Sequence, residues 1–314
     1  MSQVKRCILL LFFSGLISFI QPGVLFGEND FGYAVYLYKT GNYPGAIIEL
    51  NRFIYHNPVD YQSNYLRLLV ALSYANTGQY NSALASLSAL SNHLEAGPHF
   101  EGAYDLLCES YFHMLNIMFR QKMFYDFQVK KEQIQASCMN LGFELDRELK
   151  DHVIFMTAAG YIYNLEWQKA MDELGEFQAP NSDSSTMRIK NLLEIELKEV
   201  IDRRDKSPVL GGILAIVPGL GHLYAGRPAD GVRSLLFNSA FAALTVYAFY
   251  ERQYALGSVL AVVEGVLYAS NIYGAVNAVQ QENAIYIIQK RDNMLRNIAI
   301  PPLDVITIRK ALDL

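Results

Sequence analysis

The sequence predicts an all-α protein in which helical hairpin repeats precede an α-helical transmembrane hairpin domain. Small and apolar residues recur at matching spacings in three segments of the first two thirds of the chain. Two later apolar runs, Gly231–Tyr250 and Tyr254–Val279, each reach the ~20 residues that a helix needs to cross a ~30 Å hydrocarbon core. Hydrophobic residues make up 52% of the chain, above the soluble average of about 45–50%. We therefore expect a helical domain joined to a membrane.

Residues 1–27 have the pattern of an export signal. Lys5 and Arg6 precede the apolar stretch Cys7–Ile20, and cleavage after Gly27 would remove the segment as a signal peptide. Left uncut, the segment is long enough to serve as a signal anchor. Either outcome places the chain from residue 28 onward outside the cytoplasm.

Residues 28–200 contain a repeated pattern. The first match is Ala34, Leu37, Gly41, Tyr43, Ala46, Leu50 and Phe53. The second is Ala71, Tyr74, Gly78, Tyr80, Ala83, Leu87 and Leu90, and the third is Ala158, Tyr161, Leu165, Trp167, Ala170, Leu174 and Phe177. This pattern resembles the tetratricopeptide repeat, a helix–turn–helix unit of about 34 residues. The resemblance implies stacked helix pairs with a concave groove that takes a peptide or a partner helix.

The residue types suit those positions. Small Ala residues let paired helices approach closely, and Gly41 and Gly78 end a helix without a Cβ penalty. The third match departs from the pattern because Leu165 stands where Gly is usual. The aromatic residues Tyr43, Tyr80 and Trp167 of the pattern are expected in the core rather than in the groove.

Candidate partner-binding residues come from the exposed faces of the first helices of the repeats. They are Tyr36, Tyr38, Asn64, Arg67 and Tyr163. A protein or peptide is the expected partner, since acidic residues outnumber basic ones in this half and would repel nucleic-acid phosphates.

Cys108 and Cys138 follow the signal segment, and both lie in sequence of helical pattern. A hairpin turning near Met123 would bring them to matching heights, where an oxidising compartment favours a disulfide. Two small buried thiols are the other interpretation. The sequence leaves both open.

Residues 201–284 form the predicted membrane module. Its motif residues are Pro218, Gly219, Gly221, His222, Tyr224, Gly226, Arg227 and Gly231, with Asn271 and Asn277 further along. The pattern resembles the two-helix TM-two domain and related modules at the C-termini of bacterial repeat proteins. The resemblance implies a compact membrane domain without an assigned activity.

The first apolar run of this module, residues 208–224, is broken by Pro218 and its glycines. It either crosses the bilayer as a short span or re-enters. The distribution of basic residues favours three crossings, with Arg227 and Lys290 inside and Arg252 outside.

Glu264 lies within an apolar run, where a carboxylate is costly. It either locks helices together or, with His222, acts in transport. The patterns Gly257-x-x-x-Ala261 and Gly265-x-x-x-Ala269 suit close helix packing within the module or in a homo-oligomer.

No nucleophile, carboxylate pair or metal-ligand spacing indicates an enzyme, and no cofactor is expected. The sequence predicts a non-catalytic protein–protein interaction scaffold of the bacterial envelope. We expect it in the inner membrane with the repeats on the periplasmic side. The alternative is a transporter or channel subunit that uses Glu264 and His222, with the repeats as a regulatory domain. Residues 285–314 are assigned to a C-terminal tail, whose apolar residues favour a short strand or a hydrophobic tether.

Overall fold

The computed structural model describes residues 31–58, 60–97, 100–177, 184–298 and 301–306, so the predicted signal segment 1–27 lies outside it. The described residues form helices joined by turns and loops, which confirms the all-α fold of helical hairpins with an apolar hairpin after them. The chain divides into two compact units. Unit 1 contains residues up to Val153 together with the segment from Ile300 onward, and unit 2 contains Ile154–Ala299.

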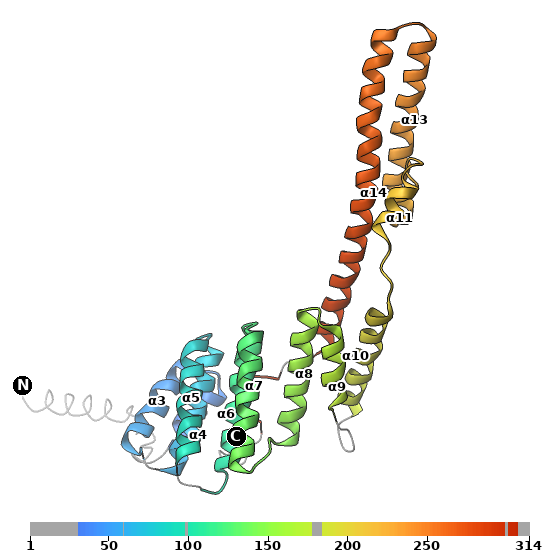
Figure 1. Ribbon diagram of the computed structural model, residues 1–314. Helices are drawn as coiled ribbons and strands as arrows, with labels where there is room; N and C mark the ends of the chain where they lie inside the picture. Colours follow the sequence, from blue (N-terminus) through green and yellow to red (C-terminus); the bar gives the residue numbers. More distant parts are fainter. Residues whose placement is uncertain (1–30, 59, 98–99, 178–183, 299–300, 307–314) are drawn as a thin grey trace, which may run out of the picture. The chain divides into compact units, whose positions relative to one another are not determined.

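Unit 1 is a row of antiparallel helix pairs (Figure 1). Its helices are α2 (Gly32–Lys39), α3 (Tyr43–His56), α4 (Tyr61–Asn76), α5 (Tyr80–Ala96), α6 (Ala103–Arg120) and α7 (Phe124–Leu141), followed by the start of α8 (Arg147–Tyr163). Residues of the repeated pattern fill the core: Ala46, Leu50, Ala71, Ala83 and Leu87 are completely buried. Burial of small Ala residues lets neighbouring helices approach closely, as the spacing predicts.

The same type of turn joins the two helices of each pair. In each, a residue in the left-handed region ends the first helix: Gly41, Gly78, Lys122 and Leu165, with φ of 77°, 78°, 58° and 65°. The residue after each of them donates its N–H to a carbonyl five residues back, as in Asn42 to Leu37 at 2.9 Å. The turn near Met123 therefore exists without glycine, because Lys122 takes up the left-handed conformation.

Cys108 and Cys138 are both free and buried. Of the two interpretations, the structure has the pair of buried thiols.

Unit 2 continues from the end of α8 through α9 (Trp167–Gly175) and α10 (Ser184–Asp202) to the apolar module. The module contains α11 (Pro208–Leu214), α12 (Leu220–Tyr224), α13 (Pro228–Tyr250) and α14 (Tyr254–Asn297). Helices α13 and α14 form a long hairpin, with α11 and α12 packed beside α14 (Figure 1). Helix α14 runs through the first residues of the predicted tail, 285–297.

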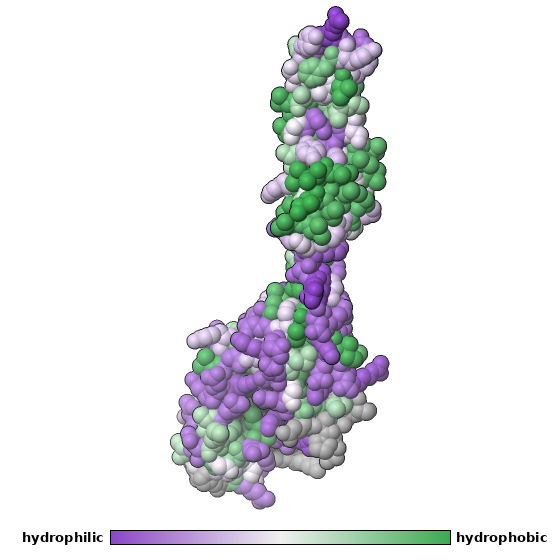
Figure 2. All heavy atoms as spheres, turned by 45° about the vertical axis from the view of Figure 1, so that its right-hand side comes forward, coloured by the Kyte–Doolittle hydropathy of each residue, from purple (hydrophilic) through white to green (hydrophobic). Residues whose placement is uncertain are grey.

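Helices α13 and α14 are long and apolar enough to cross a membrane. Only 11% of the most apolar window of each is buried, and Figure 2 shows hydrophobic side chains gathered on the surface of this hairpin. A core helix of a soluble domain would hide that surface. The exposed apolar faces therefore suit contact with lipid.

The three crossings that the basic residues favour require residues 208–224 to span the membrane. Helix α11 has 7 residues, or about 10 Å of length, too short for a ~30 Å core. Moreover, residues 31–153 and 301–306 belong to one compact unit, so they lie on one side of any membrane. An even number of crossings between them would agree with this, and α13 and α14 are two described helices long and apolar enough to cross.

Candidate functional site

The segment Pro301–Ile306 is a non-helical stretch of unit 1, with bends at Leu303, Asp304 and Ile306. Pro301, Leu303 and Val305 are buried, whereas Pro302 is exposed and Asp304 and Ile306 are half-buried. Every second side chain of this bent segment is therefore packed against unit 1. Of the two readings of the tail, a hydrophobic tether fits this packing.

Side chains from two helices hold the main chain of this segment. The Asn116 Nδ2 donates to the Pro301 carbonyl at 3.1 Å, and the Arg120 guanidinium donates to the same oxygen at 2.5 Å. The Asn76 Nδ2 donates to the Leu303 carbonyl at 2.7 Å. In each of these hydrogen bonds the acceptor is a backbone carbonyl, a group that every polypeptide carries.

Two carboxylates complete the contacts. The Glu109 Oε1 accepts the N–H of Ile306. The Tyr38 hydroxyl donates to the Asp304 Oδ1 at 2.9 Å. Burial, together with the Asp304 carboxylate, raises the pKa of Tyr38 well above its usual range, which keeps the hydroxyl protonated as a donor. We call Tyr38, Asn76, Glu109, Asn116 and Arg120 the tail-binding surface.

Helix α6 supplies three of these residues from one face. Glu109, Asn116 and Arg120 are spaced by seven and four residues, so at 3.6 residues per turn they lie in one row. His113 belongs to the same row, with its Nε2 3.4 Å from Glu109 Oε1, and both side chains are fully buried. Burial lowers the pKa of Arg120, whose Nε donates to Asn116 Oδ1 at 3.0 Å.

This row is a signal that the sequence analysis missed. A polar residue at every turn of an otherwise apolar helix marks a face that needs polar partners, because buried polar groups are almost always hydrogen-bonded.

Of the candidate partner-binding residues, the structure places Tyr38 in the tail-binding surface. Tyr36 lies about 200° around α2 from Tyr38 and is 59% exposed. Asn64 is buried within α4. Tyr163 belongs to unit 2, where the Arg291 guanidinium lies 5.6 Å from its ring centroid.

Arg67 faces away from the surface. It is nine residues from Asn76 on α4, half a turn around the helix. There it lines a small pocket between α3, α4 and α5, together with Asn51 and His93.

In unit 2, Asn271 of α14 closes the break between α11 and α12. Its Nδ2 donates to the Ala215 carbonyl at 2.7 Å. Its Oδ1 accepts the Gly219 N–H at 3.3 Å and the Ser234 hydroxyl at 2.5 Å. A broken helix at membrane depth needs such substitutes for its lost backbone hydrogen bonds.

The motif glycines permit close packing at the same place. A Cβ on Gly221 would lie 2.6 Å from the Ala275 Cβ and 2.8 Å from the Ala215 Cβ. Gly219 has a φ of 91° and lies against the Gly231 backbone. Pro218 directly precedes this turn.

The other motif residues have separate places. Tyr224 accepts the Ser207 N–H on its hydroxyl at 3.0 Å, and Arg227 donates to Gln281 at 2.7 Å. Gly226 has a φ of 86° and ends α12. Asn277 is exposed on α14.

His222 and Glu264 are not brought together. The His222 ring packs against Gly274, where a Cβ would lie 3.3 Å from its Cε1. Glu264 is ten residues earlier on α14, about 15 Å along the helix axis.

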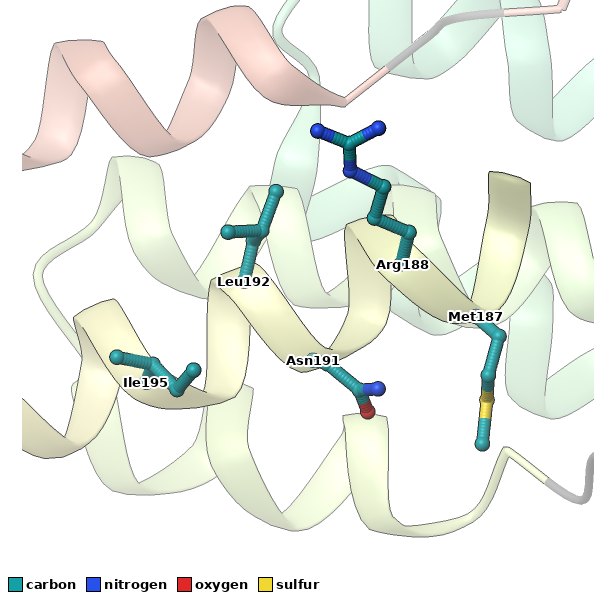
Figure 3. Close-up of a pocket in the computed structure, with 5 residues that line it drawn as sticks. All are labelled: Met187, Arg188, Asn191, Leu192 and Ile195. Carbon is teal, nitrogen blue, oxygen red and sulfur yellow. The ribbon is translucent and has the colours of Figure 1, made fainter. Parts of the chain in front are cut away.

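A shallow hollow in unit 2 runs along a single helix. Met187, Arg188, Asn191, Leu192 and Ile195 line it, all from α10 (Figure 3). In Figure 3, Arg188 and Leu192 point to one side of the helix and Met187 and Asn191 to another, so these groups do not converge.

Within the described ranges, no three His, Cys, Asp or Glu side chains are grouped as metal ligands. Comparisons with protein-family models, with curated proteins and with solved structures found no match to this chain.

Proposed function

We propose that this protein is a membrane-tethered, non-catalytic scaffold whose repeat unit binds a non-helical segment of a partner protein. The tail-binding surface carries this proposal. It contacts backbone carbonyls of the non-helical segment 301–306 and buries alternate side chains of that segment, which is the chemistry of polypeptide recognition. The tetratricopeptide resemblance, with its peptide-binding groove, agrees with this assignment.

The membrane hairpin supplies the tether. Helices α13 and α14 anchor the chain, and the even number of crossings keeps residues 31–153 and 301–306 on one side. We place the protein in the bacterial inner membrane with this side in the periplasm, because the first apolar segment usually dominates orientation and residues 1–27 resemble an export signal. The work of such a scaffold lies in envelope assembly, secretion or the organisation of membrane complexes.

In-cell crosslinking followed by mass spectrometry tests the proposal. The double variant Asn76→Ala, Asn116→Ala removes two backbone contacts of the surface, and Asn140→Ala, an exposed position on α7, is the matched control. We expect specific partners of the wild-type protein to persist in the control and to disappear in the double variant. Partner lists that are identical in all three proteins would contradict the proposed surface.

A second candidate function, a transporter or channel subunit, has one observation in its favour. The Glu264 Oε2 is buried without a hydrogen-bond partner among the described residues, and an ionisable residue inside a membrane helix often marks a transport path. If Glu264 acts in transport, Glu264→Gln abolishes function at unchanged membrane abundance. Under the scaffold proposal, the same variant retains its partners.

A further inference from the structure

The tail-binding surface is occupied by the chain's own residues. We propose that Pro301–Ile306 is an intramolecular competitor, and that the partner is a non-helical segment of the same chemistry: an acidic residue between two apolar ones. Binding of the partner then releases the tail. This inference rests on the proposed function and names both its ligand class and its regulation.

The contacts of the tail define the ligand. Leu303 is 8% exposed and Val305 is fully buried, so the surface has places for two apolar side chains spaced by two residues. Asp304 between them meets the Tyr38 hydroxyl. The apolar residue at the Val305 position must be compact, because close-packed interiors accept added volume poorly.

The tail suits release more than permanent incorporation. Pro302 is exposed, and Asp304 and Ile306 are half-buried, so three of the six residues are partly or fully in solvent. The conformational entropy lost in ordering six residues offsets much of the free energy gained by burying three side chains. The intrinsic affinity of the tail for the surface is therefore moderate, and a partner segment of the same chemistry can displace it.

The covalent connection makes the tail an effective competitor. Because the tail belongs to the same chain, its effective concentration at the surface is about 1 mM. If the intrinsic Kd of the tail is about 10 μM, the apparent affinity of the surface for a ligand in trans falls roughly a hundredfold. Partners of low local concentration are therefore excluded, whereas a partner concentrated at the same membrane displaces the tail.

The test uses the full-length protein in detergent micelles and a fluorescent peptide with the sequence of residues 300–308. Binding is measured by anisotropy for the wild-type protein and for Leu303→Asp, which places a charge at a buried position and frees the tail. We expect the variant to bind the peptide at least tenfold more tightly than the wild type. Equal affinities would overturn the competition.

A second pair of variants guards against misfolding. A chain ending at Ala299 removes the tail altogether, and its helical circular dichroism must match that of the wild type. It is expected to bind like Leu303→Asp, and Asn116→Ala in the truncated chain is expected to lose at least fivefold. A peptide with Lys in place of Asp304 is expected to bind at least fivefold more weakly. Failure of the peptide to bind any folded variant would overturn the ligand class.

The two proposals fail differently. Partners that depend on Asn76 and Asn116 in cells, with peptide binding unaffected by the tail, would retain the scaffold and reject the competitor. Partners that crosslink equally to the wild type and to the Asn76→Ala, Asn116→Ala variant would rule out the tail-binding surface as the partner site.

Discussion

Asn271 accepts the backbone N–H of Gly219 at 3.3 Å across 52 residues of sequence, at the point where the first apolar run of the module is broken. The same side chain donates to the Ala215 carbonyl. One amide therefore pairs a donor and an acceptor on the two sides of the break. It fixes the turn between α11 and α12 against α14.

Replacing the Asn271 side chain tests its contribution to stability. Asn271→Leu leaves the Ala215 and Gly219 backbone groups without their side-chain partner, and we expect a loss of about 1–3 kcal/mol in the free energy of unfolding. Thermal unfolding in detergent measures the effect. Asn277→Leu, six residues along the same helix and exposed, is the control and should change stability little. Equal losses in both variants would argue against the clamp.

Two glycines of the module should respond in opposite directions to alanine. Gly221→Ala places a methyl group against Ala275 and Ala215, so we expect overpacking to destabilise the protein by about 1–3 kcal/mol. Gly265 has nothing within 4 Å of an added Cβ, and Gly265→Ala should be neutral or stabilising by up to ~1 kcal/mol. Unfolding in detergent compares them. A large loss in Gly265→Ala would indicate that the predicted small-residue face packs in an oligomer.

Leu165 has a backbone conformation that favours glycine, with a φ of 65°. Relief of that strain, about 1–2 kcal/mol, exceeds the entropy that glycine adds to the unfolded chain, so Leu165→Gly should stabilise the fold by about 0.5–1 kcal/mol. Denaturant unfolding tests it. Leu165→Ala keeps a Cβ and should show no gain; identical behaviour of the two variants would rule out strain as the cause.

The buried Cys108 thiol predicts a pH dependence. Burial raises its pKa to about 12, whereas an exposed thiol has a pKa of about 8.5. Above that lower value the unfolded chain loses this proton and the folded chain keeps it, so the contribution to stability falls as pH rises from about 9 toward 12. Chemical denaturation of wild type and Cys108→Ala at pH 8 and pH 10 measures the difference. The wild type should lose more stability than the variant; parallel losses would contradict the raised pKa.

If α13 and α14 cross the membrane, we predict that the tip of their hairpin and the repeats lie on opposite sides of it. In a cysteine-free background, Glu251→Cys at the tip and Tyr125→Cys, 81% exposed on α7, report the two sides. A membrane-impermeant maleimide should label them from opposite sides. Three crossings place both residues on one side, so labelling from a single side would restore that topology.

The local pattern of apolar residues predicted the helical pairs. It did not predict contacts between segments that are distant in the sequence. Ala46, Leu50 and Ala83 are buried as their spacing predicts, because helical periodicity is a property of neighbouring residues. Asn271 was identified as a motif residue, but its partners at Ala215 and Gly219 follow only from the fold.

The tail-binding surface was largely beyond prediction for the same reason. Tyr38 was named, whereas Asn76, Asn116 and Arg120 were not, because their partners are residues 301 and 303. The hydrophobic pattern places helices but does not pair a side chain with a carbonyl 185 residues away. The polar row on α6 was the available clue. Charge distribution favoured a third crossing, whereas the structure divides the run 208–224 between the short helices α11, of 7 residues, and α12, of 5 residues.

The contact between Tyr38 and Asp304 also sets an order of events during synthesis. The two residues are separated by 266 positions. At ~5–20 residues per second, a ribosome adds the second residue about 13–50 s after the first. Until then the Tyr38 hydroxyl lacks this partner, and α13 and α14, which lie between the two residues in the sequence, are synthesised before the contact can form. A chain terminated before Asp304 therefore presents Tyr38 without this hydrogen-bond partner.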